Sequence, residues 1–164
     1  MGQHDSQITW RATLIRYAPL ILWIGVIAFL SSRFASMAET SRFIGPVLKY
    51  LFPSASEEIL RSIHVGIRKI AHFTEYSLLA FFAVRAFASS SLKARGQLIY
   101  ILPLALVVVV ASADEINQSF DVARTGLASD ALLDMASGAV MIAVLWTMNW
   151  PRQIAISERQ PDDE

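Results

Sequence analysis

Four long apolar runs constrain this chain more than any other feature of its sequence. They are Tyr17–Leu30, Ile70–Ala88, Leu98–Ala113 and Ala131–Trp146. A membrane-spanning helix needs about 20 mostly apolar residues, and each run reaches that length with a few neighbours. Only 17% of the residues are charged, against about a quarter in soluble chains. We therefore predict one all-α integral membrane domain over residues 1–164, with four transmembrane helices at about 12–31, 70–89, 97–118 and 131–150.

The first run has a second interpretation. Arg11 and Arg16 precede it, and Ser36-Met37-Ala38 follows it, which resembles a secretory signal with a cleavage site. We favour a retained span, because the polar lead-in is long and three helices alone would shield a charged interior poorly.

The long connection between the first two runs predicts an amphipathic helix. Ser54-Ala55-Ser56-Glu57 fits a capping box, so we expect a helix to begin near Ser54. Isoleucines then recur at helical spacing, at Ile59, Ile63, Ile67 and Ile70. We expect this helix to lie at the membrane interface and to lead into the second span.

Polar residues gather at one end of the predicted bundle. Short loops make neighbouring spans antiparallel, so the start of the second span, the end of the third and the start of the fourth share one side. The polar residues placed there are His72, Glu75, Asp114, Glu115, Gln118, Arg124, Asp130 and Asp134. Ionisable groups inside a membrane face the bundle interior or water and pair with one another. We expect Lys69 and Arg124 to meet the carboxylates, whereas Asp114 and Asp121, which lie at the loop, are interpreted as holding the helices in register or as exposed to water.

The surplus of acids over bases in this layer suggests chemistry beyond pairing. The candidate catalytic residues for acid–base chemistry are His72 paired with Glu75, which follows it by three residues, or alternatively Glu115. His72, Glu75, Glu115 and Asp134 would also suit Mg, Mn or Fe. Because such spacing is common by chance, we predict no metal and no cofactor. The absence of cysteine excludes thiolate sites and disulfides.

The distribution of Lys and Arg predicts the orientation. The short loop with Lys93 and Arg95 contains no acid, and a basic flank precedes the first span. By the positive-inside rule both termini are cytoplasmic and the polar layer faces outward, in the cell inner (cytoplasmic) membrane. The net charge of +0 suggests no nucleic-acid partner, and the sequence predicts no oligomeric state.

Three segments resemble the VanZ-like family in order and spacing. They are KIAHFTEYSLLA (Lys69–Ala80), DEINQSF (Asp114–Phe120) and RTGLASDALLDMASG (Arg124–Gly138), so the resemblance covers about residues 69–146. The matching positions are Lys69, His72, Phe73, Tyr76, Glu115, Gln118, Phe120, Arg124, Asp130, Asp134 and Gly138. Ile142 departs from the pattern, because family members often have a second glycine there.

The resemblance implies a small multi-pass membrane protein. The family takes its name from a protein associated with low-level resistance to teicoplanin, a glycopeptide with a lipid tail that acts on cell-wall precursors. The expected partners are therefore membrane lipid and a lipid-linked envelope precursor or glycopeptide. The expected ligand-binding residues are Lys69, Tyr76, Gln118, Arg124, Asp130 and Asp134, and the expected structural residues are Gly138, Phe73 and Phe120.

Two alternatives to this function are open at the level of sequence. The chain can instead be a non-enzymatic membrane scaffold or partner-binding subunit whose polar residues only fix helix packing. A proton or cation carrier is disfavoured, because the acids lie in one layer and the span centres offer no path across.

Overall fold

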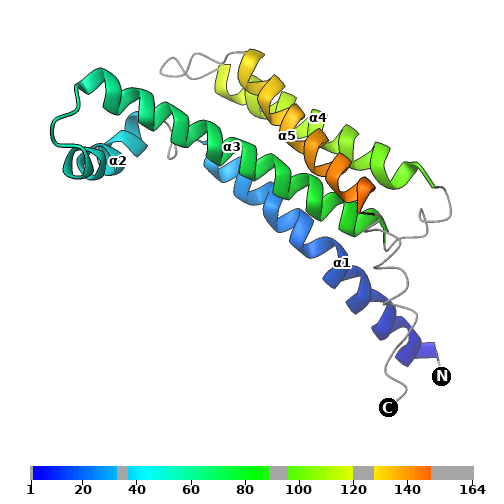
Figure 1. Ribbon diagram of the computed structural model, residues 1–164. Helices are drawn as coiled ribbons and strands as arrows, with labels where there is room; N and C mark the ends of the chain where they lie inside the picture. The colour runs from blue at the N-terminus through cyan, green and yellow to red at the C-terminus, as the bar shows by residue number, and fades with distance from the viewer. Residues whose placement is uncertain (1, 33–36, 89–95, 120–127, 149–164) are drawn as a thin grey trace.

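The structure is a computed structural model that describes residues 2–32, 37–88, 96–119 and 128–148. Five helices and no strands occur within these ranges (Figure 1). The helices are α1 (Gly2–Leu30), α2 (Met37–Leu51), α3 (Glu57–Ala88), α4 (Leu98–Ser119) and α5 (Ala128–Thr147). The all-α class predicted from the apolar runs is therefore confirmed.

Helix α3 is the centre of the bundle. It packs against α1 on one side and against the α4–α5 pair on the other (Figure 1). Its packed half is rich in small residues, and Ala80, Ala83 and Ala86 are each fully buried. Small side chains let neighbouring helix backbones approach closely in membrane proteins. Helix α1, in contrast, packs mainly on α3 and makes little or no contact with α4 and α5.

Within the described ranges three helices, rather than the four expected, are long and apolar enough to cross a membrane. They contain the stretches Thr13–Leu30, Leu98–Ser119 and Ser129–Thr147, with mean hydropathies of 1.9, 2.0 and 1.4. Most residues of these stretches are not buried by other helices, and many large apolar side chains are exposed, including Ile21 and Val109. Such surfaces suit lipid. The expected second span falls short because His72, Glu75 and Arg85 lie within it.

Helix α3 continues beyond the bundle as an arm. Its 32 residues correspond to about 48 Å at 1.5 Å per residue, which exceeds the roughly 30 Å of a hydrocarbon core. The predicted amphipathic helix and the predicted second span are thus two parts of one uninterrupted helix. The helix begins at Glu57 rather than near Ser54, because Ser56 caps it: the Ile59 amide donates to Ser56 Oγ at 3.3 Å.

Helix α2 packs along the first half of α3 and was not foreseen from the sequence (Figure 1). A buried histidine joins the two helices. His64 of α3 is only 4% exposed, and its ring nitrogens lie 3.3 Å from Thr40 Oγ1 and 3.2 Å from Ser41 Oγ of α2. Burial, together with the nearby charge of Arg68, lowers the pKa of His64 below its ordinary value.

Helices α4 and α5 approach each other closely at Gly138. A Cβ atom at this position would lie 2.6 Å from Val107 Cγ1, a separation that carbon atoms do not tolerate. Ile142, the position at which the sequence departs from the family pattern, is 8% exposed and belongs to the core. The close approach at Gly138 is therefore not repeated by a glycine one turn along α5.

Candidate functional site

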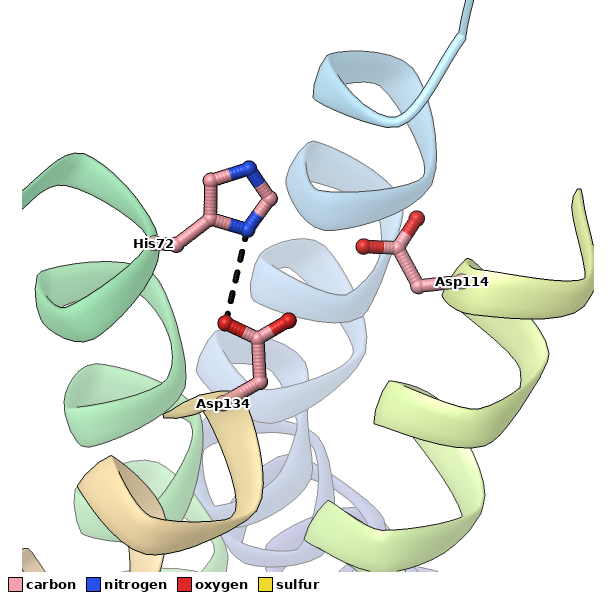
Figure 2. A group of neighbouring side chains, drawn as sticks. All are labelled: His72, Asp114 and Asp134. Carbon is pink, nitrogen blue, oxygen red and sulfur yellow. Dashed lines mark ion pairs between the residues drawn. The ribbon is translucent and has the colours of Figure 1, made fainter. Parts of the chain in front are cut away.

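Four side chains from three helices meet at one end of the bundle. We call His72 and Tyr76 of α3, Asp114 of α4 and Asp134 of α5 the polar cluster. Figure 2 shows His72, Asp114 and Asp134 directed toward a common space between their helices. The antiparallel order inferred from the short loops brings these segments to the same end, as expected. Helix α1 closes the cluster with the residues at its C-terminal end (Figures 1 and 2).

Asp114 is a buried member of this site, so the expectation that it lies at the loop was wrong. It lies inside α4 and is 7% exposed. Tyr76, which is fully buried, donates its hydroxyl hydrogen to Asp114 Oδ2 at 3.1 Å. Ser31 Oγ at the end of α1 donates to Asp114 Oδ1, and Asn117 Nδ2 donates to Ser31 Oγ at 3.3 Å. One carboxylate therefore joins α1, α3 and α4.

The carboxylate partner of His72 is Asp134, not Glu75. Asp134 is 3% exposed, and its Oδ1 lies 3.4 Å from His72 Nδ1. Neither of these two atoms has a hydrogen-bond partner within the described structure, although both are inaccessible to solvent. The side chain of Glu75 lies one turn along α3 and is half-buried. The predicted proton-handling pair of His72 and Glu75 is therefore not the pair that the fold brings together.

Three further hydrogen bonds fix the backbones around the cluster. Ser77 Oγ of α3 donates to the carbonyl oxygen of Ser137 in α5 at 3.4 Å. Ser137 Oγ donates to the Asp134 carbonyl at 2.7 Å. Trp23 Nε1 of α1 donates to the Glu75 carbonyl at 2.9 Å. The Ser77 contact joins α3 to α5 and the Trp23 contact joins α1 to α3, whereas the Ser137 hydroxyl bonds within α5.

The remaining predicted site residues lie around the cluster or away from it. Glu115, Gln118 and Asp130 are half-buried at the same end of the bundle. Lys69 is exposed and forms no ion pair within the described ranges, so the expected meeting of Lys69 with the carboxylates is not observed. Phe73, expected to be structural, is 42% exposed. Arg124, Phe120 and Asp121 lie outside the described residues.

An apolar groove between α1 and α4 leads to the polar cluster. Its volume is about 420 Å³, and it exists because α1 packs on α3 while leaving α4 largely uncovered. Its polar end is formed by Ser31, Asp114 and Asn117. The rest of its wall consists of Ile24, Ile27, Ala28, Val109, Val110 and Ala113. An elongated molecule with one polar end and one apolar end fits this lining.

The cluster carries more negative charge than its own residues neutralise. Asp114 and Asp134 are both buried, and His72 forms an ion pair with Asp134. Buried carboxylates need an opposite charge, a proton or several hydrogen-bond donors. The arrangement is therefore suited to binding a positively charged group or to holding a proton.

The sequence did contain a signal for Asp114. Pro103, Val107 and Ala111 are buried on one face of α4, and the helical spacing continues from Ala111 to Asp114. Reading that face to its end places Asp114 in the interior. Ser31 carries no such signal, because it follows the apolar run and is positioned only by the packing of α1 on α3.

Comparison with known proteins identifies a family relationship. A protein-family model described as VanZ/LLP1 matches residues 17–149. This match covers all four apolar runs and every residue of the polar cluster. No curated protein and no solved structure shows a significant match to the chain.

Proposed function

The chain belongs to the VanZ/LLP1 family, and on that premise we propose that it binds the polar group of a lipid-linked molecule of the cell envelope. The polar cluster is the proposed binding site, at the outer face of the inner membrane. The observation that carries this proposal is the apolar groove that runs between α1 and α4 and ends at Asp114.

We propose that the packed half of α3 crosses the membrane as a fourth span. The polar residues of α3 are compatible with a membrane span, because α1, α4 and α5 surround this helix. Tyr76 and Ser77 are buried, and His72 meets Asp134 inside the bundle. A helix screened from lipid by its neighbours can carry polar residues that an isolated span cannot.

The groove supports a lipid-linked ligand because of where it opens. It lies on the side of the bundle between two helices with exposed apolar faces, so an acyl or prenyl chain could enter it from the bilayer. The polar end of such a molecule would then meet Ser31, Asp114 and Asn117. Teicoplanin and the lipid-linked cell-wall precursors both combine a lipid chain with a large polar group. The family association with teicoplanin resistance thus agrees with the geometry.

The test is to fill the groove without touching the polar cluster. Ala113→Phe places a ring in the groove, whereas Ala105→Phe adds the same ring to an exposed site of α4 that does not line it. Teicoplanin susceptibility is measured in cells that express each variant, with membrane abundance determined in parallel. We expect Ala113→Phe to lose the protection given by the unchanged chain and Ala105→Phe to retain it. Equal protection by both variants at equal abundance would exclude the groove as the ligand site.

The scaffold function is a second candidate, because each contact in the polar cluster joins two helices. His72–Asp134 links α3 to α5, and Tyr76–Asp114 links α3 to α4. If these contacts only fix helix packing, exchanging the partners should be harmless. The double variant His72→Asp with Asp134→His would then protect cells as well as the unchanged chain. A ligand site depends on which helix presents which group, so on our proposal the exchanged variant folds but gives no protection.

A further inference from the structure

We propose that His72, Asp114 and Asp134 bind one divalent first-row metal ion, such as Zn²⁺ or Mn²⁺. Each of the three residues offers a ligand atom, and these atoms all lie within 4.8 Å of one another. They come from three different helices and are directed toward one space (Figure 2). An imidazole nitrogen with two carboxylate oxygens is a ligand set that these metals accept.

The separation of His72 and Asp134 fits a shared ion. A metal about 2.0–2.1 Å from each ligand in tetrahedral geometry holds them about 3.3 Å apart. The distance between His72 Nδ1 and Asp134 Oδ1 is 3.4 Å. A direct N–H···O bond would prefer about 2.9 Å. Asp114 offers the third ligand atom, within 4.8 Å of the other two.

The missing hydrogen bonds of two buried atoms in the site are a second observation, although these two atoms form an ion pair with each other. Asp134 is 97% buried, being 3% exposed, and its Oδ1 accepts no hydrogen bond within the described structure. His72 Nδ1 likewise has none. Buried polar atoms almost always have a partner, and an ion is one of the partners that can satisfy them. Both atoms face the space that the metal would fill.

The surroundings of the three ligands match the requirements of a metal site. Two carboxylates with a neutral imidazole have a charge of −2, which a divalent cation cancels in a medium where charge is costly. Asp114 is oriented by hydrogen bonds from Tyr76 and Ser31. Such outer partners orient metal ligands and commonly affect affinity by about 10–100-fold.

A bound ion would also allow the acidic site to bind a lipid-linked molecule whose polar group carries a phosphate. Three protein ligands leave at least one coordination position open, which water or a phosphate oxygen can take. The ion would then supply the positive charge that the polar cluster lacks. Only this last step rests on the proposed function; the metal site itself stands on the contacts of the three residues.

The test is metal binding by the purified full chain in detergent micelles. A tag without histidine is used, the protein is stripped with a chelator, and Zn²⁺ or Mn²⁺ is titrated by calorimetry. We expect one ion per chain and at least a tenfold loss of affinity in Asp134→Asn and in His72→Gln. Tyr76→Phe should weaken binding about 10–100-fold, because Asp114 loses an orienting partner. The matched controls His64→Gln and His4→Gln should bind as the unchanged chain does.

Spectroscopy decides the outcome if the ligand variants fail to fold. The unchanged chain loaded with Mn²⁺ is measured by pulsed electron paramagnetic resonance, which detects an imidazole nitrogen bound to the ion. The nitrogen coupling should persist in a chain that carries both His4→Gln and His64→Gln, where His72 is the one histidine left. Absence of binding, or of the coupling, would overturn the proposal even if the lipid-binding function holds. Normal metal binding by the unchanged chain, together with equal protection by Ala113→Phe and Ala105→Phe, would separate the two in the opposite direction.

Discussion

The crossing at Gly138 gives the most quantitative prediction about the bundle. A methyl group at this position would lie 2.6 Å from Val107 Cγ1 and 3.0 Å from Val107 Cγ2. Val107 is fully buried, and a β-branched side chain in a helix strongly prefers a single rotamer. Gly138→Ala should therefore force α4 and α5 apart, at about 1–3 kcal/mol for an overpacked core.

Gly25→Ala is the matched control for the same substitution. Gly25 lies inside α1 with no atom within 4 Å of an added Cβ. Replacing a helix-interior glycine by alanine gains about 0.8–1.0 kcal/mol from helix propensity at either position. Because this gain cancels in the comparison, Gly138→Ala should be about 1–3 kcal/mol less stable than Gly25→Ala.

The assay is reversible unfolding in mixed detergent micelles, followed by circular dichroism. Adding Val107→Ala to Gly138→Ala removes both clashing methyl groups. The pair should therefore show a favourable coupling energy of about 1–2 kcal/mol in a double-mutant cycle. If Gly138→Ala is as stable as Gly25→Ala, the close approach of α4 and α5 is not a feature of the folded protein.

Two further predictions concern the polar cluster and the arm. Tyr76→Phe removes one hydrogen bond to a buried carboxylate and should lower the free energy of unfolding by about 1.5–3 kcal/mol. Tyr100→Phe breaks no such bond and should change the free energy of unfolding little in the same assay. The pKa of His64 in the folded chain lies below its ordinary value. Between the folded and the unfolded pKa the unfolded arm therefore binds more protons than the folded arm. The stability that His64 contributes is fully present above about pH 6.5 and is lost as the pH falls through the folded pKa. A single cysteine at Leu48, which is 5% exposed, should therefore gain maleimide reactivity relative to one at Val47, which is 56% exposed, as the pH falls. His64→Gln should abolish the change in this ratio, and a ratio that does not depend on pH in the unchanged chain would exclude His64 as the cause.

The apolar runs predicted most of the fold, because a membrane span leaves a length and composition signal that is independent of tertiary contacts. Helix α2 was missed because its apolar residues are interrupted by Gly45 and Pro46, and it is stabilised by packing on α3. The second span was predicted from its apolar residues, yet its polar ones keep it below the hydropathy of the other three. Their burial depends on neighbours that no local pattern shows.

The candidate site was predictable in location but not in pairing. Antiparallel helices and short loops suffice to bring His72 and Asp134 to the same end of the bundle. Which carboxylate His72 contacts depends on how each helix is rotated about its own axis. In the structure Asp134 Oδ1, rather than Glu75, lies 3.4 Å from His72 Nδ1. Asp114 was placed at the loop because its position was judged from its distance along the chain, and not from the face of α4 on which it lies. Ser31 became part of the site only through the packing of α1.

The orientation of the polar cluster is the central claim, and cysteine labelling in intact cells tests it directly. The chain has no cysteine, so Glu58→Cys at the cluster end and Gln97→Cys at the opposite end can each be examined alone, and both positions are exposed. With a membrane-impermeant maleimide we predict labelling of Glu58→Cys in intact cells and of Gln97→Cys only after permeabilisation. The reverse pattern would place the polar cluster in the cytoplasm, and labelling of both in intact cells would show that α3 does not cross the membrane.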